Sequence, residues 1–377
     1  MPPNTLVHPH SDQVDFGHDS WIQDIINDTP YIDIEVTSPE LFEGAWKVVS
    51  FVFPSWKKDN LKFTQCKDGI TNQLVRVTDT GSKESVLVRA YGKGSERIID
   101  RRQEIINIIT LSRQGLAPPL YARFRNGLIY GFIEGRVSHV DDLGHPKMAK
   151  WIATRLAQWH KVELPQPTED HLHHKTKHQP DQKLWKTMRG WLDQVPDKYD
   201  DPKTQATFAN RFDMKHIKTE MEELINHLEK LESPIVFSHN DLLYGNIIFD
   251  DDKEEAYFID YEYGCYAYRG FDIGNHFNEH CGFECDYSKY PSKNFQLEWL
   301  EWYLQAINDD VTPTKEQINK LYNEVNGFSL ASHFYWGLWA MIQAMVSDID
   351  FDYMEYAVLR FDEYEKRKEQ VLNYLSI

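Results

Sequence analysis

The sequence predicts an α+β fold, with a β-rich N-terminal part and a larger, mainly helical C-terminal part. Up to about residue 133, short runs rich in β-branched residues alternate with turn residues, and a single helical stripe interrupts them. From residue 134 onward, apolar residues recur mostly at helical spacing. The chain has 377 residues, enough for two or three structural units, and a 41% hydrophobic fraction allows each unit to bury a core.

The charge and the cysteine content narrow the class of protein. The chain carries 59 acidic and 41 basic side chains, a formal charge of −18, which opposes binding to the phosphate backbone of nucleic acids. We therefore expect no nucleic-acid partner. No run of about 18 apolar residues and no N-terminal signal pattern is present, so neither stable membrane insertion nor secretion is expected. Four cysteines without a CxxC pair argue against a disulfide framework and favour a cytoplasmic protein.

The N-terminal part is predicted to contain an arm and a lobe. Residues 1–40 are expected to form a flexible arm, because the first thirty or so lack sustained apolar periodicity. Residues 41–133 are expected to form a β-rich N-terminal lobe. Its elements are predicted as strand, strand, helix, strand and strand, at 61–77, 85–91, 96–114, 120–124 and 128–133. Gly115 is the predicted stop of the helix.

Residues 134–377 are predicted to form the helical lobe. Apolar stripes indicate helices near 151–160 and 214–232. Two later helices begin at pairs with the spacing of a capping box, Thr314 with Gln317 and Asp352 with Glu355. The segment 164–181 holds four histidines, which are His171, His173, His174 and His178. They could bind a metal, but they have no regular spacing and no acidic partner, so a solvated loop is the preferred interpretation.

The most informative stretch runs from Ile235 to Asp260. An apolar strand leads into His239-Asn240-Asp241, Asn246 follows five residues after the aspartate, and a later strand ends in Asp260. The turn between these strands brings the three side chains to one edge. Phosphoryl transfer needs one carboxylate to accept the proton of the attacking hydroxyl, and an amide oxygen with a second carboxylate to hold magnesium. An acidic surface loop is the alternative, but several matched positions in a strand-loop-strand context favour a catalytic site.

The same region resembles the choline/ethanolamine kinase family, and its ethanolamine kinases most of all. The resemblance rests on the stretch above together with the run from Tyr268 to Glu279, and it extends over about 63–364, including 68–72, 86–92 and 331–339. It implies a protein-kinase-like two-lobe fold, with a small β-rich N-terminal lobe and a larger helical C-terminal lobe. It also implies ATP as co-substrate and Mg²⁺ as cofactor.

The resemblance assigns roles only where residues match. Asp241 would be the catalytic base, and Asn246 and Asp260 would be the magnesium ligands. Asp272 is expected to brace the catalytic loop by accepting backbone hydrogen bonds. His239 is expected to position the same loop, because as a free general base it would lack an orienting carboxylate.

Nucleotide contacts are expected in the N-terminal lobe, from a turn, a strand, a helix and the hinge. Without the resemblance, the turn at 68–72 would equally well be a simple hairpin, and Arg89 a solvated cation. With it, Arg89 would lie over the phosphates and pair with Glu104, and the hinge would offer its backbone to adenine. The expected contacts are Thr71, Asn72, Arg89, Glu104, Gly131 and Ile133.

An amine site is expected from aromatic rings and one carboxylate. Trp336 and Trp339 share one helix face, and aromatic faces attract organic cations. A tryptophan pair taken alone would more often be core. The resemblance makes this pair, Tyr263, Tyr356 and the negatively charged Glu279 the substrate site. Tyr261, and a segment after Glu279 that departs from the aromatic-rich continuation of choline kinases, favour ethanolamine.

The predicted function is a magnesium-dependent ethanolamine kinase that makes phosphoethanolamine for phosphatidylethanolamine synthesis. A choline kinase or a dual-specificity kinase is the alternative within this class. From other classes, the alternatives are an inactive nucleotide- or amine-binding module and an antibiotic phosphotransferase. Ethanolamine and ATP are the expected partners, and a homodimer is possible.

Overall fold

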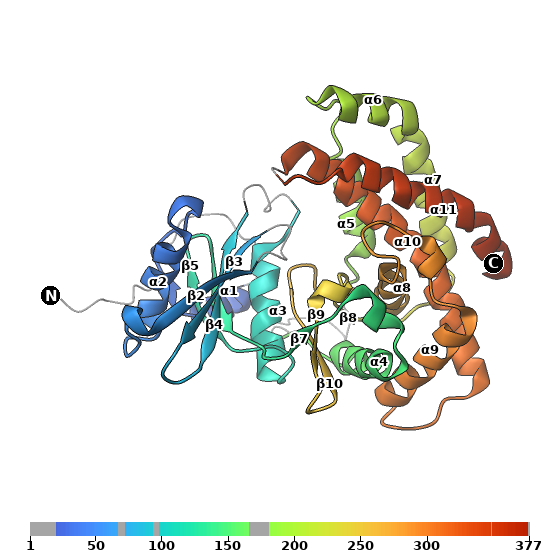
Figure 1. Cartoon of the computed structure of the whole chain (residues 1–377). Helices are drawn as coiled ribbons and strands as arrows, with labels where there is room; N and C mark the ends of the chain where they lie inside the picture. The colour runs from blue at the N-terminus through green and yellow to red at the C-terminus, as the bar shows by residue number, and fades with distance from the viewer. Residues whose placement is uncertain (1–19, 67–71, 93–97, 166–180, 348, 376–377) are drawn as a thin grey trace. The chain divides into compact units, whose positions relative to one another are not determined.

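The computed structural model describes residues 20–66, 72–92, 98–165, 181–347 and 349–375 (Figure 1). The chain divides into two compact units, 1–134 with 164–176 and 135–163 with 177–377. The first is built around a β-sheet, and the second consists mainly of helices. The predicted α+β class is therefore confirmed.

The N-terminal unit contains one mixed sheet within its described residues. Its strands are β1 (Tyr31–Ile32), β2 (Leu61–Cys66), β3 (Asn72–Asp79), β4 (Ser85–Tyr91), β5 (Leu120–Phe124) and β6 (Gly127–Gly131). They lie in the order β1-β5-β6-β4-β3-β2. Only the β1–β5 pair among them is parallel, and the other neighbours are antiparallel, as short connections allow.

Helices cover the two faces of this sheet. Helix α2 (Leu41–Val52) buries Ala45, Val48 and Val49 against alternate residues of the strands, among them Val86 and Val88 of β4. Because side chains alternate along a strand, Arg89 points to the other face, where it meets α3 (Arg101–Arg113). Gly115 stops α3 as predicted: its φ is +71°, and the N–H of Leu116 bonds back to the carbonyl of Leu111.

Two N-terminal details differ from the sequence prediction. Structure begins before Leu41, with α1 (Ser20–Asn27) and β1, because the isolated apolar residues Ile26, Ile32 and Val36 are buried although they show no periodicity. The run 61–77 forms two strands rather than one, because β2 ends at Cys66 and β3 begins at Asn72. Residues 1–19 and 67–71 lie outside the described residues.

The C-terminal unit contains α4 to α11 and five short strands among its described residues. The helices are α4 (Pro146–His160), α5 (Leu184–Leu192), α6 (Pro202–Arg211), α7 (Met214–Glu229), α8 (Arg269–Glu279), α9 (Lys293–Ile307), α10 (Lys315–Val346) and α11 (Tyr353–Leu375). The strands are β7 (Arg136–Val137), β8 (Ile235–Ser238), β9 (Ile247–Asp250), β10 (Glu255–Phe258) and β11 (Cys265–Tyr268). Strand β8 pairs with β11, and β9 pairs with β10 and β7.

Helix α10 is the centre of this unit. It lies against α5, α7, α8, α9 and α11 (Figure 1). Most of its second half is buried. Its predicted capping box is confirmed, because Thr314 and Gln317 each accept a hydrogen bond from the other's N–H. Asp352 likewise accepts from the N–H of Glu355. No helix in the described ranges is both long enough and apolar enough to span a bilayer.

The other predicted helices of this unit are present. The helix predicted near 151–160 is α4, and the one predicted at 214–232 is α7, which ends at Glu229. The four histidines at 171–178 lie outside the described residues.

Candidate active site

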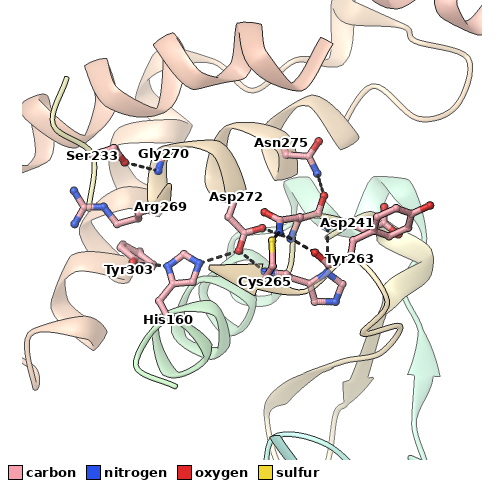
Figure 2. A network of polar contacts seen from close by, with 12 residues as sticks. His160, Ser233, Asp241, Tyr263, Cys265, Arg269, Gly270, Asp272, Asn275 and Tyr303 are labelled. Carbon is pink, nitrogen blue, oxygen red and sulfur yellow. Dashed lines mark hydrogen bonds and ion pairs between the residues drawn. The ribbon is translucent and has the colours of Figure 1, made fainter. Parts of the chain in front are cut away.

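The loop that follows β8 carries Asp241 and is held by α8. The Asp272 carboxylate accepts hydrogen bonds from the backbone N–H groups of His239 and Asn240, each at 2.7 Å (Figure 2). Asn240 adopts a left-handed conformation with φ +65°, which asparagine tolerates better than most residues. The contacts implied for Asp272 by the resemblance are thus present, and they orient the backbone just before Asp241.

A buried chain of side chains supports Asp272 from behind. His160 at the end of α4 bonds Asp272 through Nε2 at 2.9 Å and the Tyr303 hydroxyl through Nδ1 at 2.7 Å (Figure 2). Burial alone would raise the pKa of Asp272, but the hydrogen bonds from His160 and from the backbone outweigh it and hold that pKa below its usual range. The sequence analysis missed this role of His160, because a histidine on an apolar stripe gives no sign of a distant partner.

His239 connects the two loops of the site. Its Nε2 lies 3.0 Å from the carbonyl oxygen of Ile259, and its Nδ1 accepts from the N–H of Asp241 at 3.3 Å. This pattern requires a neutral ring with the proton on Nε2, and burial lowers the pKa of His239 in agreement. Both ring nitrogens are therefore engaged, which supports a positioning role rather than that of a free base.

Asp241 lies among other carboxylates. Burial raises its pKa well above the usual range, and the charges of Asp260, Glu279 and Glu262 raise it further. Asn246 opposes them, because its Nδ2 donates to the Asp241 carboxylate at 2.9 Å and to its backbone oxygen at 2.8 Å. A cluster of this kind favours any cation that enters it.

The donor set suits magnesium bound together with phosphates. Asp260 has φ +65°, a conformation that a non-glycine residue rarely adopts and that the structure around it must hold. No three of the described His, Cys, Asp and Glu side chains are grouped so as to hold a metal by themselves. Mg²⁺ usually takes one or two carboxylates and completes its shell with water and phosphate oxygens, so Asn246 and Asp260 would suffice. Glu262, which the sequence analysis passed over, is a further carboxylate beside them.

Glu279 at the end of α8 faces a buried arginine. Arg360 Nη1 of α11 lies 3.5 Å from Glu279 Oε1, and both side chains are buried. Burial raises the pKa of Glu279, and Arg360 partly offsets the effect. Arg360 also donates to the hydroxyls of Tyr356, at 3.2 Å, and Ser332, at 2.7 Å. The sequence analysis missed Arg360, since nothing in its local pattern indicates burial.

Three of the expected aromatic residues contact one another. The rings of Trp336 and Trp339 meet edge to face at 5.4 Å between centroids, and Tyr263 meets Trp336 in the same way at 5.4 Å. Trp339 Nε1 donates to the hydroxyl of Tyr263. Burial raises the pKa of that phenol, and the charges of Glu262 and Asp241 raise it further. The structure therefore brings Tyr263 and the two tryptophans together near Asp241, and it places Tyr356 near Glu279.

The segment after Glu279 contains one aromatic ring, that of Phe283. This ring lies 6.4 Å from Tyr356 and 6.3 Å from Tyr244, between ring centroids. The departure of this segment from the aromatic-rich continuation of choline kinases, which favours ethanolamine, stays a prediction.

The expected nucleotide contacts belong to the N-terminal unit. Arg89 and Glu104 form a buried ion pair at 3.4 Å, and Arg101 joins Glu104 at 3.0 Å. Gly131 ends β6, and a side chain there would meet Pro118 and Pro119 at 3.1 Å. Ile133 follows that strand. Asn72 begins β3, its side chain is not described, and Thr71 lies outside the described residues.

Comparison with known proteins supports a single family. The model of the family described as choline/ethanolamine kinase matches residues 63–365. A probable ethanolamine kinase A of Dictyostelium discoideum is 40% identical over 90% of this chain and 95% of its own length. Ethanolamine kinase 2 of Rattus norvegicus is 39% identical over 91% of this chain and 85% of its own.

Solved structures agree with this. An ethanolamine kinase of Plasmodium vivax is 28% identical, covers 93% of this chain and 95% of its own, and superposes with a TM-score of 0.77. A choline kinase of Cryptosporidium parvum shares the fold at 22% identity, with a TM-score of 0.68 over 87% of this chain and 97% of its own. The matched region contains both the Asp241 loop and the helices that carry the aromatic cluster, and the chain belongs to the choline/ethanolamine kinase family.

Proposed function

We propose that the chain is an ethanolamine kinase, which transfers the γ-phosphoryl group of ATP to the hydroxyl of ethanolamine. The observation that carries this proposal is the position of Glu279, whose negative charge acts on both Asp241 and Tyr356. An ammonium group held at Glu279 would place the hydroxyl of a two-carbon alcohol toward Asp241. The names of the relatives favour ethanolamine, which offers three N–H donors to Glu279, over choline, which offers none.

The chain's own residues would perform most of the chemistry by positioning and charge. Asp241 would orient the hydroxyl and accept its proton, and the raised pKa of Asp241 makes it a stronger base than an exposed aspartate. Asn246 and Asp260, with Glu262 nearby, would hold Mg²⁺, whose charge would stabilise the transferring phosphoryl group. Arg89, held by Glu104, would contact the nucleotide phosphates, and the backbone near Gly131 and Ile133 would contact adenine.

The setting of the enzyme follows from the same proposal. Phosphoethanolamine would serve phosphatidylethanolamine synthesis. None of the four cysteines, all of which lie in the described ranges, is in a disulfide, which is usual for a reducing compartment and supports the cytoplasm. The possible homodimer stays a prediction.

Side-by-side turnover tests the proposal. Purified chain with ATP and Mg²⁺ is given ethanolamine, choline or an aminoglycoside, and the phosphorylated product is identified by mass spectrometry and ³¹P NMR. We expect phosphoethanolamine at the highest kcat/KM, and a turnover lowered by about 10²–10⁴-fold in the Asp241→Asn variant. A higher kcat/KM with choline would make choline the substrate in place of ethanolamine. Phosphorylation of the aminoglycoside alone would make the chain an antibiotic phosphotransferase.

A further inference from the structure

Asn275 holds the peptide that carries the catalytic aspartate. It lies on α8 three residues after Asp272, and is fully buried. Its Nδ2 donates to the carbonyl oxygen of Asn240 at 3.1 Å (Figure 2). The N–H at the other end of the same peptide, that of Asp241, is bonded to His239. The peptide between Asn240 and Asp241 is therefore fixed at both its oxygen and its hydrogen.

The other end of the Asn275 amide faces the aromatic cluster. Its Oδ1 accepts from Trp336 Nε1 at 2.7 Å and from Ser332 Oγ at 2.8 Å. Ser332 Oγ accepts in turn from Arg360, which faces Glu279. Arg360 donates to Ser332, Ser332 donates to Asn275, and Asn275 donates to Asn240. Each bond therefore joins one donor hydrogen to one acceptor oxygen, and all three can form together.

We propose that Asn275 is a positioning residue that couples the amine pocket to the catalytic loop. An amine packed against Trp336 would fix the position of the indole ring. The indole N–H donates to the Asn275 amide, and that amide donates to the carbonyl of the peptide between Asn240 and Asp241. A carboxamide accepts from the indole through its oxygen and donates to a carbonyl through its nitrogen, whereas an ionised aspartate or a leucine of similar size cannot do both. The inference rests on the proposed function, because it takes Trp336 as part of the substrate site.

A double-mutant cycle on kcat tests the coupling. Asn275→Ala and Trp336→Phe should each lower kcat with ethanolamine by about 10- to 100-fold, since small displacements of catalytic groups have effects of this size. The KM for ATP should change little. Because both changes break the same chain, the double variant should be about as slow as the slower single variant.

Two matched controls separate coupling from packing. Asn278 is equally buried on α8, but its Nδ2 donates to the Ser329 carbonyl on α10 and not to the catalytic loop. Asn278→Ala should therefore retain most of kcat. Trp339→Phe removes an indole that donates to Tyr263 instead, so its effect should multiply with that of Asn275→Ala.

Amide hydrogen exchange gives a readout that does not depend on turnover. The N–H groups of residues 239–241 should exchange faster in Asn275→Ala and in Trp336→Phe than in the unaltered chain or in Asn278→Ala. Saturating ethanolamine should slow that exchange in the unaltered chain but not in Asn275→Ala. If Asn275→Ala does not fold, Ser332→Ala combined with Trp336→Phe removes both donors to the same oxygen and carries the same test.

The outcomes distinguish the inference from the proposed function. The inference would be overturned if the effects of Asn275→Ala and Trp336→Phe on kcat multiplied in the double variant while amide hydrogen exchange at 239–241 stayed unchanged. Asn275 would then be a packing residue, whatever the substrate. An unaltered chain that phosphorylates no ethanolamine, while Trp336→Phe still accelerates exchange in the loop, would overturn the proposed function and leave the connection from Trp336 to the loop in place.

Discussion

At the scale of single residues, the site is defined by negative charges that the fold holds close together. Burial raises the pKa of Asp241, and the charges of Asp260, Glu279 and Glu262 raise it further. Such an arrangement costs stability in the absence of a cation, and the binding of substrate and metal would relieve it. Removing one of these negative charges should therefore raise the free energy of unfolding while lowering the activity.

Asp241→Asn should stabilise the chain while abolishing catalysis. Because the folded-state pKa of Asp241 lies above that of the unfolded chain, the folded state binds its proton more tightly, and stability is lost as pH rises through the raised pKa. The variant should gain about 1 kcal/mol or more at pH 7, since one pKa unit corresponds to about 1.4 kcal/mol. Urea unfolding without metal or nucleotide, at several pH values, measures the gain.

The gain should shrink toward pH 4, and kcat should fall by about 10²–10⁴-fold. Asp201→Asn is the control of opposite sign, because hydrogen bonds from Thr204 lower the pKa of Asp201 at the start of α6. That change should destabilise the chain and spare kcat. A destabilised Asp241→Asn variant, or one that keeps more than a tenth of kcat, would contradict the assignment.

Glu279→Gln should change the choice between amines. The carboxylate can accept charge-assisted hydrogen bonds from a primary ammonium, worth about 1.5–3 kcal/mol, whereas a quaternary ammonium has no proton to donate. The KM for ethanolamine should therefore rise more than the KM for choline, with the KM for ATP little changed. Steady-state kinetics on both amines measures the ratio.

Glu363→Gln serves as its control, since Glu363 is a buried carboxylate that pairs with Lys366 on α11, and no effect of its charge on Asp241 is found. If Glu279→Gln raised the KM for ethanolamine and the KM for choline equally, Glu279 would attract both amines by its charge alone and would not select between them.

At the scale of elements, α8 is the part of the fold on which the site depends. Asp272, Asn275 and Glu279 lie on it, and its first residues are anchored by the Arg269–Glu324 ion pair and by Ser233, which accepts from the N–H of Gly270. Its middle approaches α10 so closely that a Cβ on Gly274 would lie 2.7 Å from the Val325 oxygen. Helix α8 is thus anchored at its start, paired with Arg360 through Glu279 at its end, and packed closely on α10 between them. These contacts fix the positions of its three functional side chains relative to one another.

Gly274→Ala should therefore destabilise the chain and reduce its activity. The added methyl meets backbone rather than a flexible side chain, so the two helices must separate, at about 1–3 kcal/mol. Gly190→Ala in α5 is the matched control, because nothing lies within 4 Å of its added Cβ, and it should be neutral or stabilising by up to about 1 kcal/mol. Equal effects of the two changes on thermal unfolding would mean that the α8–α10 approach is not strained.

At the scale of the whole molecule, the chain carries excess negative charge, and part of it lies in the candidate site. The formal charge is −18, and it includes the buried carboxylates of Asp241, Glu262 and Glu279. Because these carboxylates favour a divalent cation, Mg²⁺ together with ATP should bind the folded chain and raise its unfolding temperature.

Removal of the metal should abolish activity reversibly. EDTA should stop turnover and lower the unfolding temperature measured with ATP, and excess Mg²⁺ should restore both. Asp260→Asn should need more Mg²⁺ for half-maximal rate, because a neutral amide offsets less of the metal's charge. A loss of rate in Asp260→Asn that no concentration of Mg²⁺ improves would indicate that Asp260 is structural.

The sequence by itself determined the features that depend on local order. Short strands, the Gly115 stop, the capping box at Thr314 and the loop around Asp241 follow from spacing and backbone preference, so a single pass along the chain predicts them. It also indicated the family, because long runs such as 268–279 resemble it, and the family model matches residues 63–365.

The tertiary structure decided the features that depend on partners far apart in the chain. His160 meets Asp272 over 112 positions, and Trp336 meets Asn275 over 61, and no local pattern encodes either contact. The burial of Arg360 and the return of Phe283 to the aromatic cluster were likewise invisible in the sequence. Hydrogen bonds and charges act between atoms a few ångströms apart, so only the packing of α4, α8, α10 and α11 determines which of these side chains hold the site together.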